Sequence, residues 1–477
     1  MRKVRTARLL FVTGMAAGLA VATVPTAAIA AAAPAGAGHY TPGAPGMGDP
    51  YFPDEGNGGY DVGHYALDLS YAPDTHHLQG TATITARATQ NLSRFDLDLQ
   101  DLKASGVTVD GRRAAFAQQG QELVITPPRG LPRGRTFRVA VAYGGTPVTI
   151  KGSPIVFGSD YGWQYTKDGA FVGCEPNAAS TWYPSNDHPG DKATFSYRIT
   201  VPKDRKVIAN GDYQGATKSG GKATFRWNEN RPMATYLATI NIGKWNFETD
   251  RTPSGIRNFS AFDPAYTAAD RSRIMKTTND VTDYWSKTFG RYPFSSTGAI
   301  VDSVPDVGFS LETQTRPLYG YNVETGTIAH ELAHQWFGDA VSVKTWANIW
   351  LNEGFATFAA NLYDEHTGGA TTWADFQKTY DHYAAGNAFW NQSIADPQRD
   401  TMFSGAVYDR GGMTLAALRH KVGDKKFFAI LRDWVAQHKY GNGTTEQFVA
   451  LSERVTHQDL GNFFQVWLWD KTKPTTW

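Results

Sequence analysis

The hydrophobic pattern changes its period partway along the chain, and this change limits the folds that are available to it. Between residues 51 and 243, apolar and polar residues alternate, as half-buried strands require. The alternation is clearest where Ala82, Ile84 and Ala86 interleave with threonines, and where Phe95, Leu97 and Leu99 interleave with Asp96 and Asp98. Three turn sequences lie between apolar runs and predict tight hairpins: Asp110-Gly111, Asn210-Gly211 and Ser219-Gly220-Gly221. We expect an antiparallel sandwich or saddle.

Helical spacing replaces this alternation in the second half of the chain. Ile274, Val281 and Trp285 recur at helical intervals, and Gly290 follows where a helix can end in a left-handed residue. The ranges expected to be helical are 267–289, 327–337, 349–366, 413–422, 425–438 and 445–455. The fold class is therefore α+β. We place a β-rich N-terminal domain at 50–250 and a mostly helical catalytic domain at 251–477.

The first thirty residues have the composition of a secretory signal peptide. Basic residues up to Arg8 precede an apolar stretch at 9–24, and Ala28-Ile29-Ala30 matches a cleavage site. A membrane anchor needs about 20 apolar residues, whereas this stretch is shorter and is broken at Thr13 and Gly14. We therefore expect a secreted protein with no membrane span in the mature chain. Residues 31–49, rich in Ala, Gly and Pro, are expected to form a disordered spacer.

Charge and cysteine content exclude several classes of function. The formal net charge is +1, which gives no general attraction to nucleic acids, so no nucleic-acid partner is expected. Cys174 is the only cysteine, so the chain can form no internal disulfide. A lone cysteine could be a nucleophile, but no base pattern accompanies it, and a small buried thiol is the commoner role.

The most informative motif is His330-Glu331-Leu-Ala-His334. Residues four apart on a helix project from one face, so both imidazoles can bind a single cation, for which zinc is well suited. Glu331 follows the first histidine, where its carboxylate can accept a proton from water beside the metal. The alternative is a pair of core histidines with a solvated glutamate between them.

A third candidate ligand favours the metal site over that alternative. Glu353 follows His334 with eighteen residues between them and begins a second helix beside Trp350, Leu351 and Phe355. A carboxylate among apolar side chains is costly to bury unless it meets a cation. Two histidines and one glutamate leave a fourth zinc position open, which is typical of a catalytic site with one zinc ion.

With these residues, the chain resembles the aminopeptidase N and leukotriene hydrolase family of gluzincins. The resemblance covers about residues 60–469, and several further segments carry it: Asp61-Val62-Gly63-His64-Tyr65, Pro232-Met233-Ala234-Thr235-Tyr236-Leu237, Gly290-Arg291-Tyr292-Pro293-Phe294 and the Asn-Glu-Gly-Phe-Ala run around Glu353. It implies a thermolysin-like zinc peptidase domain that acts on peptides with a free N-terminus. The chain is expected to be a monomer and a short form without the C-terminal helical domain of many members, so its site should be open.

The resemblance also implies two residues that bind the substrate's amine. The family's Gly-Ala-Met-Glu-Asn segment corresponds to Phe309-Ser-Leu-Glu312-Thr313, in which only the glutamate is identical. Glu175, in Cys174-Glu175-Pro176, has the spacing of a second amine-binding glutamate, although Gly173 replaces the family's usual glutamine. Carboxylates in a cleft recognise an ammonium group, which an internal peptide bond lacks.

A third position implied by the resemblance is Tyr408, which matches the family's Tyr-x-Lys/Arg-Gly element. A phenol titrates near 10, so at neutral pH it can donate a hydrogen bond to an oxyanion. The expected function is removal of the N-terminal residue from peptides, with Glu331 as general base. The alternatives are an endopeptidase of the thermolysin type, a secreted binding protein without turnover and, less in keeping with secretion, epoxide hydrolysis.

Overall fold

The computed structural model describes residues 39–304, 306–320 and 323–475. Residues from Tyr40 onward form one compact unit. The expected signal peptide, and the expected spacer up to residue 38, lie outside the described residues. Within the described part of the chain, no helix is both long enough and apolar enough to cross a membrane.

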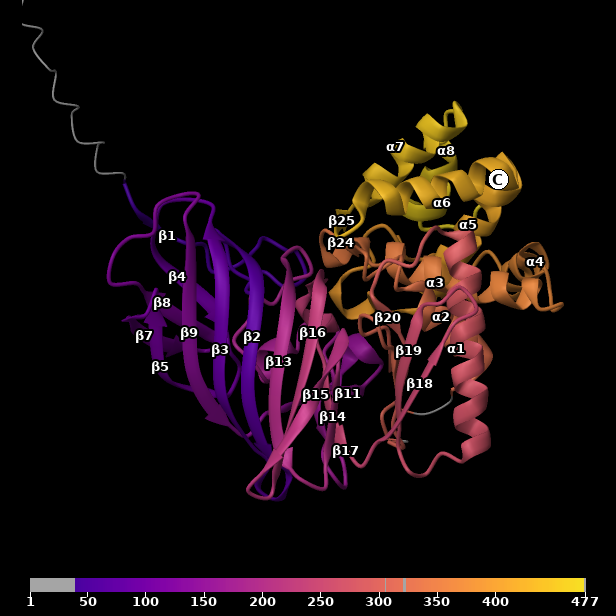
Figure 1. The fold of residues 1–477 in the computed structure, drawn as a ribbon. Coiled ribbons are helices and arrows are strands. Elements are labelled where there is room, and N and C mark those ends of the chain that lie inside the picture. The colour runs from indigo at the N-terminus through magenta and orange to yellow at the C-terminus, as the bar shows by residue number, and fades with distance from the viewer. Residues whose placement is uncertain (1–38, 305, 321–322, 476–477) are drawn as a thin grey trace, which may run out of the picture. The chain divides into compact units, whose positions relative to one another are not determined.

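Three sheets make up the N-terminal part, drawn in indigo to magenta in Figure 1. The largest has the order β15-β16-β13-β2-β3-β9-β5-β6, with bounds Asp212–Ser219, Lys222–Ala234, Lys192–Pro202, Tyr60–Ala72, His77–Ala88, Thr136–Gly145, Lys103–Val109 and Arg112–Arg113. A four-stranded sheet has the order β1-β4-β8-β7, with bounds Thr41–Pro42, Leu92–Asp98, Glu122–Thr126 and Ala115–Gln119. A five-stranded sheet has the order β10-β11-β12-β17-β14, with bounds Thr149–Ser153, Ser159–Tyr165, Ala170–Gly173, Ile240–Gly243 and Lys206–Ala209.

Two of the three predicted hairpins are confirmed. Asp110-Gly111 joins β5 to β6, with φ of 50° and 74°, and Gly220-Gly221 joins β15 to β16. The prediction for Asn210-Gly211 is wrong, because β14 pairs with β17 whereas β15 pairs with β16. Gly211 has the positive φ expected of a tight turn, but the turn carries the chain from one sheet to another.

The predicted alternation also holds in β3, but β4 departs from it. Asp96 and Asp98 are 3% and 0% exposed, although the pattern places them on a solvated face. The second face of β4 is buried because the segment that precedes β2 and the loop that follows β12 cover it. Asp98, for example, pairs with Ser185 and accepts hydrogen bonds from Asn57 and Asp187.

The folded chain begins about ten residues before the predicted start at residue 50. Strand β1 pairs in parallel with β4. Asp49 is buried, and its carboxylate accepts hydrogen bonds from the backbone N–H groups of Tyr51 and Trp346. These contacts order the end of the Gly/Pro-rich segment, which has no apolar period of its own.

A six-stranded sheet and the helices follow, in pink through orange to yellow in Figure 1. Its order is β18-β19-β21-β23-β22 with β20 on β19, and the bounds are Asn246–Arg251, Arg257–Phe262, Ile300–Val301, Leu318–Tyr319, Ser310–Leu311 and Ser296–Thr297; β24 (Val341–Val343) pairs with β25 (Gly441–Gly443). The helices are α1 Ala268–Thr288, α2 Thr325–Ala333, α3 Trp350–His366, α4 Thr372–His382, α5 Gly405–Val422, α6 Asp424–His438, α7 Thr445–Thr456 and α8 Gly461–Phe464.

This order of elements confirms the predicted α+β class. Four helices match the predicted ranges to within one residue, and α2 ends four residues before the predicted end. Helix α5 starts eight residues earlier than predicted, at Gly405 instead of Met413. Helix α4 was missed, because only Thr372 and Phe376 of its eleven residues are buried, which leaves little apolar period in the sequence. The early start of α5 matters for the site, since it places Tyr408 in the first helical turn.

Candidate metal centre and active site

Helix α2 carries the two histidines and Glu331. The backbone carbonyl of Ala329 accepts a hydrogen bond of 3.2 Å from the Trp285 indole of α1, which fixes the helix against its neighbour. The helix ends at Ala333, four residues before the predicted end, but His334 keeps helical torsions (φ −57°, ψ −25°). The two imidazoles therefore remain on one face, with ring centroids 4.8 Å apart.

Three donor atoms converge at this face. Nε2 of His330 and Nε2 of His334 lie 3.2 and 3.4 Å from Oε2 of Glu353, which comes from the first turn of α3. Nδ1 of His334 donates to the backbone carbonyl of Phe337 at 3.0 Å, which leaves Nε2 as the nitrogen that can bind a metal once it has lost its proton. Ligands about 2.1 Å from a tetrahedral zinc are separated by about 3.4 Å. The three predicted ligands thus match zinc in both chemistry and spacing.

The charges around this point favour a cation. Burial alone would lower the pKa of His334, but the carboxylates of Glu312 and Glu353 raise it to about 10. Burial would raise the pKa of Glu353, yet the two imidazoles lower it to about 2. The two shifts reflect the attraction between the imidazoles and the carboxylates around them. A divalent ion bound to the three donor atoms would supply positive charge at the same point.

Glu331 lies beside the ligands. One of its carboxylate oxygens is within 4.8 Å of ligand atoms of both Glu312 and His334. The side chain is buried, and burial raises its pKa well above the usual range, with further contributions from Glu312 and Glu353 opposed by His334. A carboxylate with a raised proton affinity in this position is suited to accept a proton and release it again.

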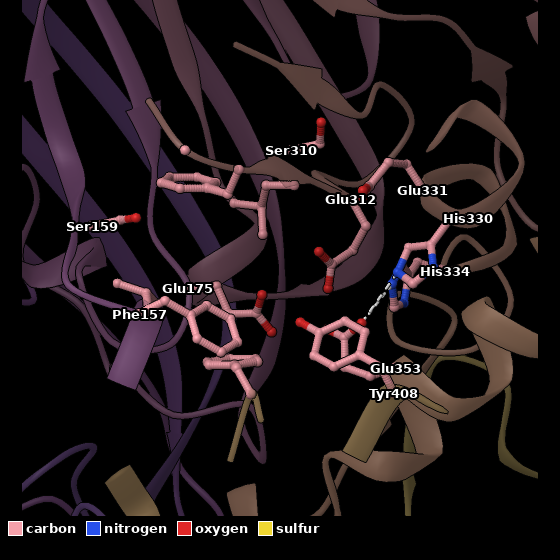
Figure 2. Close-up of a pocket in the computed structure, with 15 residues that line it drawn as sticks. Phe157, Ser159, Glu175, Ser310, Glu312, His330, Glu331, His334, Glu353 and Tyr408 are labelled. Carbon is pink, nitrogen blue, oxygen red and sulfur yellow. Dashed lines mark hydrogen bonds and ion pairs between the residues drawn. The ribbon is translucent and has the colours of Figure 1, made fainter. Parts of the chain in front are cut away.

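The two candidate amine-binding glutamates enter the same cavity from different sheets. Glu312 follows β22 and accepts a hydrogen bond of 3.3 Å from the Tyr236 hydroxyl, while Glu175 follows β12. Figure 2 shows their carboxylates directed into the same space beside the histidines. Burial, and then repulsion from Glu312, raise the pKa of Glu175, and its Oε1 is buried without a hydrogen-bond partner among the described residues. An ammonium group between the two would satisfy both.

Tyr408 completes the group of predicted residues. Its ring lies nearly parallel to that of His330, at 6.1 Å between centroids and 17° between planes. Burial, followed by the charges of Glu353 and Glu175, raises the pKa of its phenol well above 10. The hydroxyl therefore remains protonated at neutral pH and faces the cavity as a hydrogen-bond donor (Figure 2).

The cavity around these residues has a volume of about 300 Å³. Beyond the charged groups, its lining is mostly apolar and includes residues that the sequence analysis did not single out: Val156, Phe157, Phe309, Leu311 and Phe403. They come from a loop after β10, the approach to β22 and the segment before α5. No motif connects such distant segments, so only the fold could bring them together.

The sequence analysis also missed two further features of the site, each for a different reason. Tyr236 lies in a segment that the family resemblance includes, but its hydroxyl contact with Glu312 depends on tertiary structure. Gly354 and Gly411 allow α3 and α5 to touch, since a Cβ on Gly354 would lie 2.7 Å from Cα of Gly411. Their positions in the sequence, next to Glu353 and three residues after Tyr408, could have indicated a close approach of two helices at the site.

Cys174 takes no part in this chemistry. Its thiol is fully buried, and burial raises its pKa. The expectation of a small buried thiol therefore agrees with the structure.

Comparison with known families gives two matches along the chain. Residues 62–237 match the Peptidase M1 N-terminal domain and residues 312–467 match the Peptidase family M1 domain. Aminopeptidase M1-C of rice (Oryza sativa subsp. japonica) is 26% identical over 324 residues, which are 63% of this chain and 37% of the rice protein. Leukotriene A-4 hydrolase of Xenopus laevis is 24% identical over 427 residues, covering 82% of this chain and 67% of that protein. The chain thus spans less than half the length of the rice relative.

A solved structure matches over nearly its whole length. The crystal structure of an M1 zinc metallopeptidase from Deinococcus radiodurans has a TM-score of 0.80 and 30% sequence identity, covering 90% of this chain and 98% of that one. A point mutant of the same protein, in which an alanine replaces a glutamate, is bound to a Tyr-Ser-Ala substrate and matches with the same TM-score at 29% identity. With its zinc-ligand geometry and these matches, the chain belongs to the M1 family of zinc metallopeptidases.

Proposed function

We propose that the protein is a secreted, zinc-dependent aminopeptidase that removes the N-terminal residue from peptides. The observation that carries this proposal is the pair of carboxylates, Glu175 and Glu312, in the same cavity as the three metal ligands. A free α-ammonium group bound there would lie a fixed distance from the metal. The scissile bond would then be the first peptide bond of the chain.

The catalytic steps follow from the positions of the side chains. His330, His334 and Glu353 would bind the zinc, which supplies Lewis-acid activation of the substrate carbonyl and of water. Glu331 accepts a proton from the attacking water at its carboxylate and later delivers it to the leaving amine. Tyr408 donates its phenolic hydrogen to the oxygen of the scissile carbonyl as negative charge develops there.

Two relatives support the proposed reaction. The rice relative is named an aminopeptidase, and the mutant Deinococcus structure contains a tripeptide, Tyr-Ser-Ala, described as its substrate. Both support the proposal that Glu175 and Glu312 bind the first amine of a peptide. Because the chain covers only part of the rice protein, the activity itself needs a direct test.

The test compares a free-amine aminoacyl reporter with its N-acetylated form. A charge-assisted hydrogen bond to a buried carboxylate is worth about 1.5–3 kcal/mol, or roughly 10- to 150-fold in kcat/KM. Glu312→Gln should lose at least tenfold on the free-amine reporter and should scarcely change the slow rate on the acetylated one. Glu229→Gln is the matched control, because Glu229 is also a buried carboxylate but lies outside the cavity.

Other outcomes would favour the alternatives. Equal rates on free and acetylated reporters would support an endopeptidase of the thermolysin type. Full zinc occupancy without any chelator-sensitive hydrolysis would support a binding protein without turnover. Secretion is tested separately: the mass of the exported product should show cleavage after Ala30, whereas retention of residues 1–30 in the cell fraction would contradict it.

A further inference from the structure

Phe157 is exposed to solvent although it lines the active-site cavity. Its side chain is 72% exposed, the highest value among the large apolar side chains of the described chain. A single exposed apolar side chain is common on protein surfaces and by itself indicates no function. Phe157 differs because its ring also borders the cavity that contains the metal ligands and Glu175. Its position relative to a bound substrate therefore matters.

The backbone of Phe157 has a conformation that is unfavourable for phenylalanine. The residue follows the 3₁₀ turn Pro154–Val156 in the hairpin between β10 and β11, with φ of 59° and ψ of 29°. The N–H of Gly158 donates to the carbonyl of Ser153 at 2.8 Å, which closes the turn. Glycine or asparagine is usual at such a left-handed position, because a bulky side chain is strained there. Backbone conformation therefore does not explain why this residue is a phenylalanine, and strain of this kind is common at functional sites.

The hairpin holds the ring at one end of the cavity. The turn Pro154–Val156 contacts a second 3₁₀ turn, Arg399–Thr401, which belongs to the helical part. Figure 2 shows the Phe157 ring beside the carboxylate of Glu175, on the side away from the histidines. The remaining apolar lining of the cavity comes from Val156, Phe309, Leu311 and Phe403. The cavity therefore offers apolar surface as well as carboxylates to a substrate.

Under the proposed function, only one part of a peptide can reach this end of the cavity. The α-ammonium group lies between Glu175 and Glu312, and the first carbonyl lies at the metal. The peptide continues from that carbonyl, so its second and later residues lead away from the ammonium group. The side chain of the first residue is bonded to the same carbon as the ammonium group, and it can extend past Glu175 toward the Phe157 ring.

We propose that Phe157 determines specificity for the first residue of the peptide, by packing its ring against an aromatic side chain at that position. This inference rests on the proposed function. Aromatic pairs are stabilised by offset or edge-to-face contact in addition to the burial of apolar area. An alanine side chain offers only one methyl group, so it gains little from the ring. The strand-rich part would then supply both an amine ligand, Glu175, and a contact for the first side chain.

The alternative is that Phe157 only protects the packing of the hairpin against the helical part. Phe157→Asn separates the two roles, because asparagine tolerates the left-handed conformation but cannot pack as an aromatic ring. If Phe157 serves substrate binding, this variant keeps or raises the melting temperature and loses selectivity for the first residue. If Phe157 serves packing, the melting temperature falls and the selectivity remains.

The experiment measures kcat/KM of the zinc-loaded enzyme on phenylalanyl and alanyl reporters that have a free amine and the same leaving group. Wild type should prefer the phenylalanyl reporter. Phe157→Asn should lower kcat/KM on that reporter about tenfold, and should change the value on the alanyl reporter by less than roughly twofold. Phe157→Tyr keeps an aromatic ring and should retain the preference. Phe116→Asn is the matched control, because it makes the same change at an exposed ring on β7, outside the cavity.

The same measurements distinguish failure of this inference from failure of the proposed function. If wild type cleaves both reporters and Phe157→Asn lowers both rates equally, or lowers neither, the role of Phe157 is wrong while the proposed function stands. If wild type cleaves neither free-amine reporter, or cleaves their N-acetylated forms equally fast, the proposed function is wrong and the inference fails with it.

Discussion

Gly354→Ala is the substitution that most directly tests how the packing of two helices positions the catalytic groups. Gly354 follows the ligand Glu353 on α3, and it packs against Gly411 on α5, three residues after Tyr408. A Cβ at Gly354 would lie 2.7 Å from Cα and 2.9 Å from the carbonyl carbon of Gly411. Both contacts are with backbone atoms, so no side chain can rotate away to relieve them.

The size of the effect follows from these distances. Ordinary van der Waals contact begins near 3.4 Å, so the two helices must separate by at least about 0.7 Å. Overpacking of this kind costs about 1–3 kcal/mol in stability. A displacement close to 1 Å at a catalytic group can cost about 100-fold in rate. We expect the Gly354→Ala protein to fold, bind zinc more weakly and lose roughly two orders of magnitude in kcat/KM.

The assay measures kcat/KM on an aminoacyl reporter, the zinc content after dialysis and the melting temperature. Gly405→Ala is the matched control: it makes the same change at the start of α5, where an added Cβ meets no atom within 4 Å. Wild-type activity and zinc content in Gly354→Ala would refute the claim that the contact between α3 and α5 sets the geometry of the site.

Three further predictions concern the proposed roles of the site residues. Glu331→Ala should keep its zinc equivalent while hydrolysis collapses, whereas Glu353→Ala should lose zinc on dialysis, since two imidazoles rarely retain it; metal analysis of both variants checks this. Tyr408→Phe should lower kcat by about 100- to 1000-fold with little change in KM, as for removal of an oxyanion donor. Steady-state kinetics measures both constants, and a kcat close to that of wild type would mean that the ring acts only by packing. Reporters with an aromatic first residue should be cleaved faster than those with an acidic one, because Phe309 and Phe403 line a cavity that also contains carboxylates; a panel of aminoacyl reporters measures this preference.

The features that were predicted correctly depend on residues that are close together in the sequence. Helical geometry accounts for the spacing of His330 and His334, and the Nε2 atoms of both indeed lie within 3.4 Å of Glu353 Oε2. The strand alternation of β3 and the hairpin at Asp110-Gly111 likewise depend on neighbouring residues only. Such features need no knowledge of tertiary contacts.

The features that were missed depend on segments distant in the sequence. Asp98 appeared to face solvent, because alternation cannot show that a loop will cover the second face of β4. Asn210-Gly211 has the composition of a hairpin turn, yet the partners of its flanking strands are chosen by sheet packing. The apolar lining of the cavity, for example Phe157 and Phe403, comes from segments more than 200 residues apart in the chain.

The metal chemistry and the selection of a free amine come from different parts of the chain. All three proposed zinc ligands lie on α2, its C-terminal end or α3, whereas Glu175 follows a strand of the N-terminal part. Contacts such as Lys192 Nζ to the Asp339 carbonyl, at 2.7 Å, connect these parts within one compact unit. Zinc, Glu331 and Tyr408 cannot by themselves distinguish the end of a peptide from its middle. Under the proposed function, exopeptidase selectivity therefore requires the strand-rich part to be docked against the helical part.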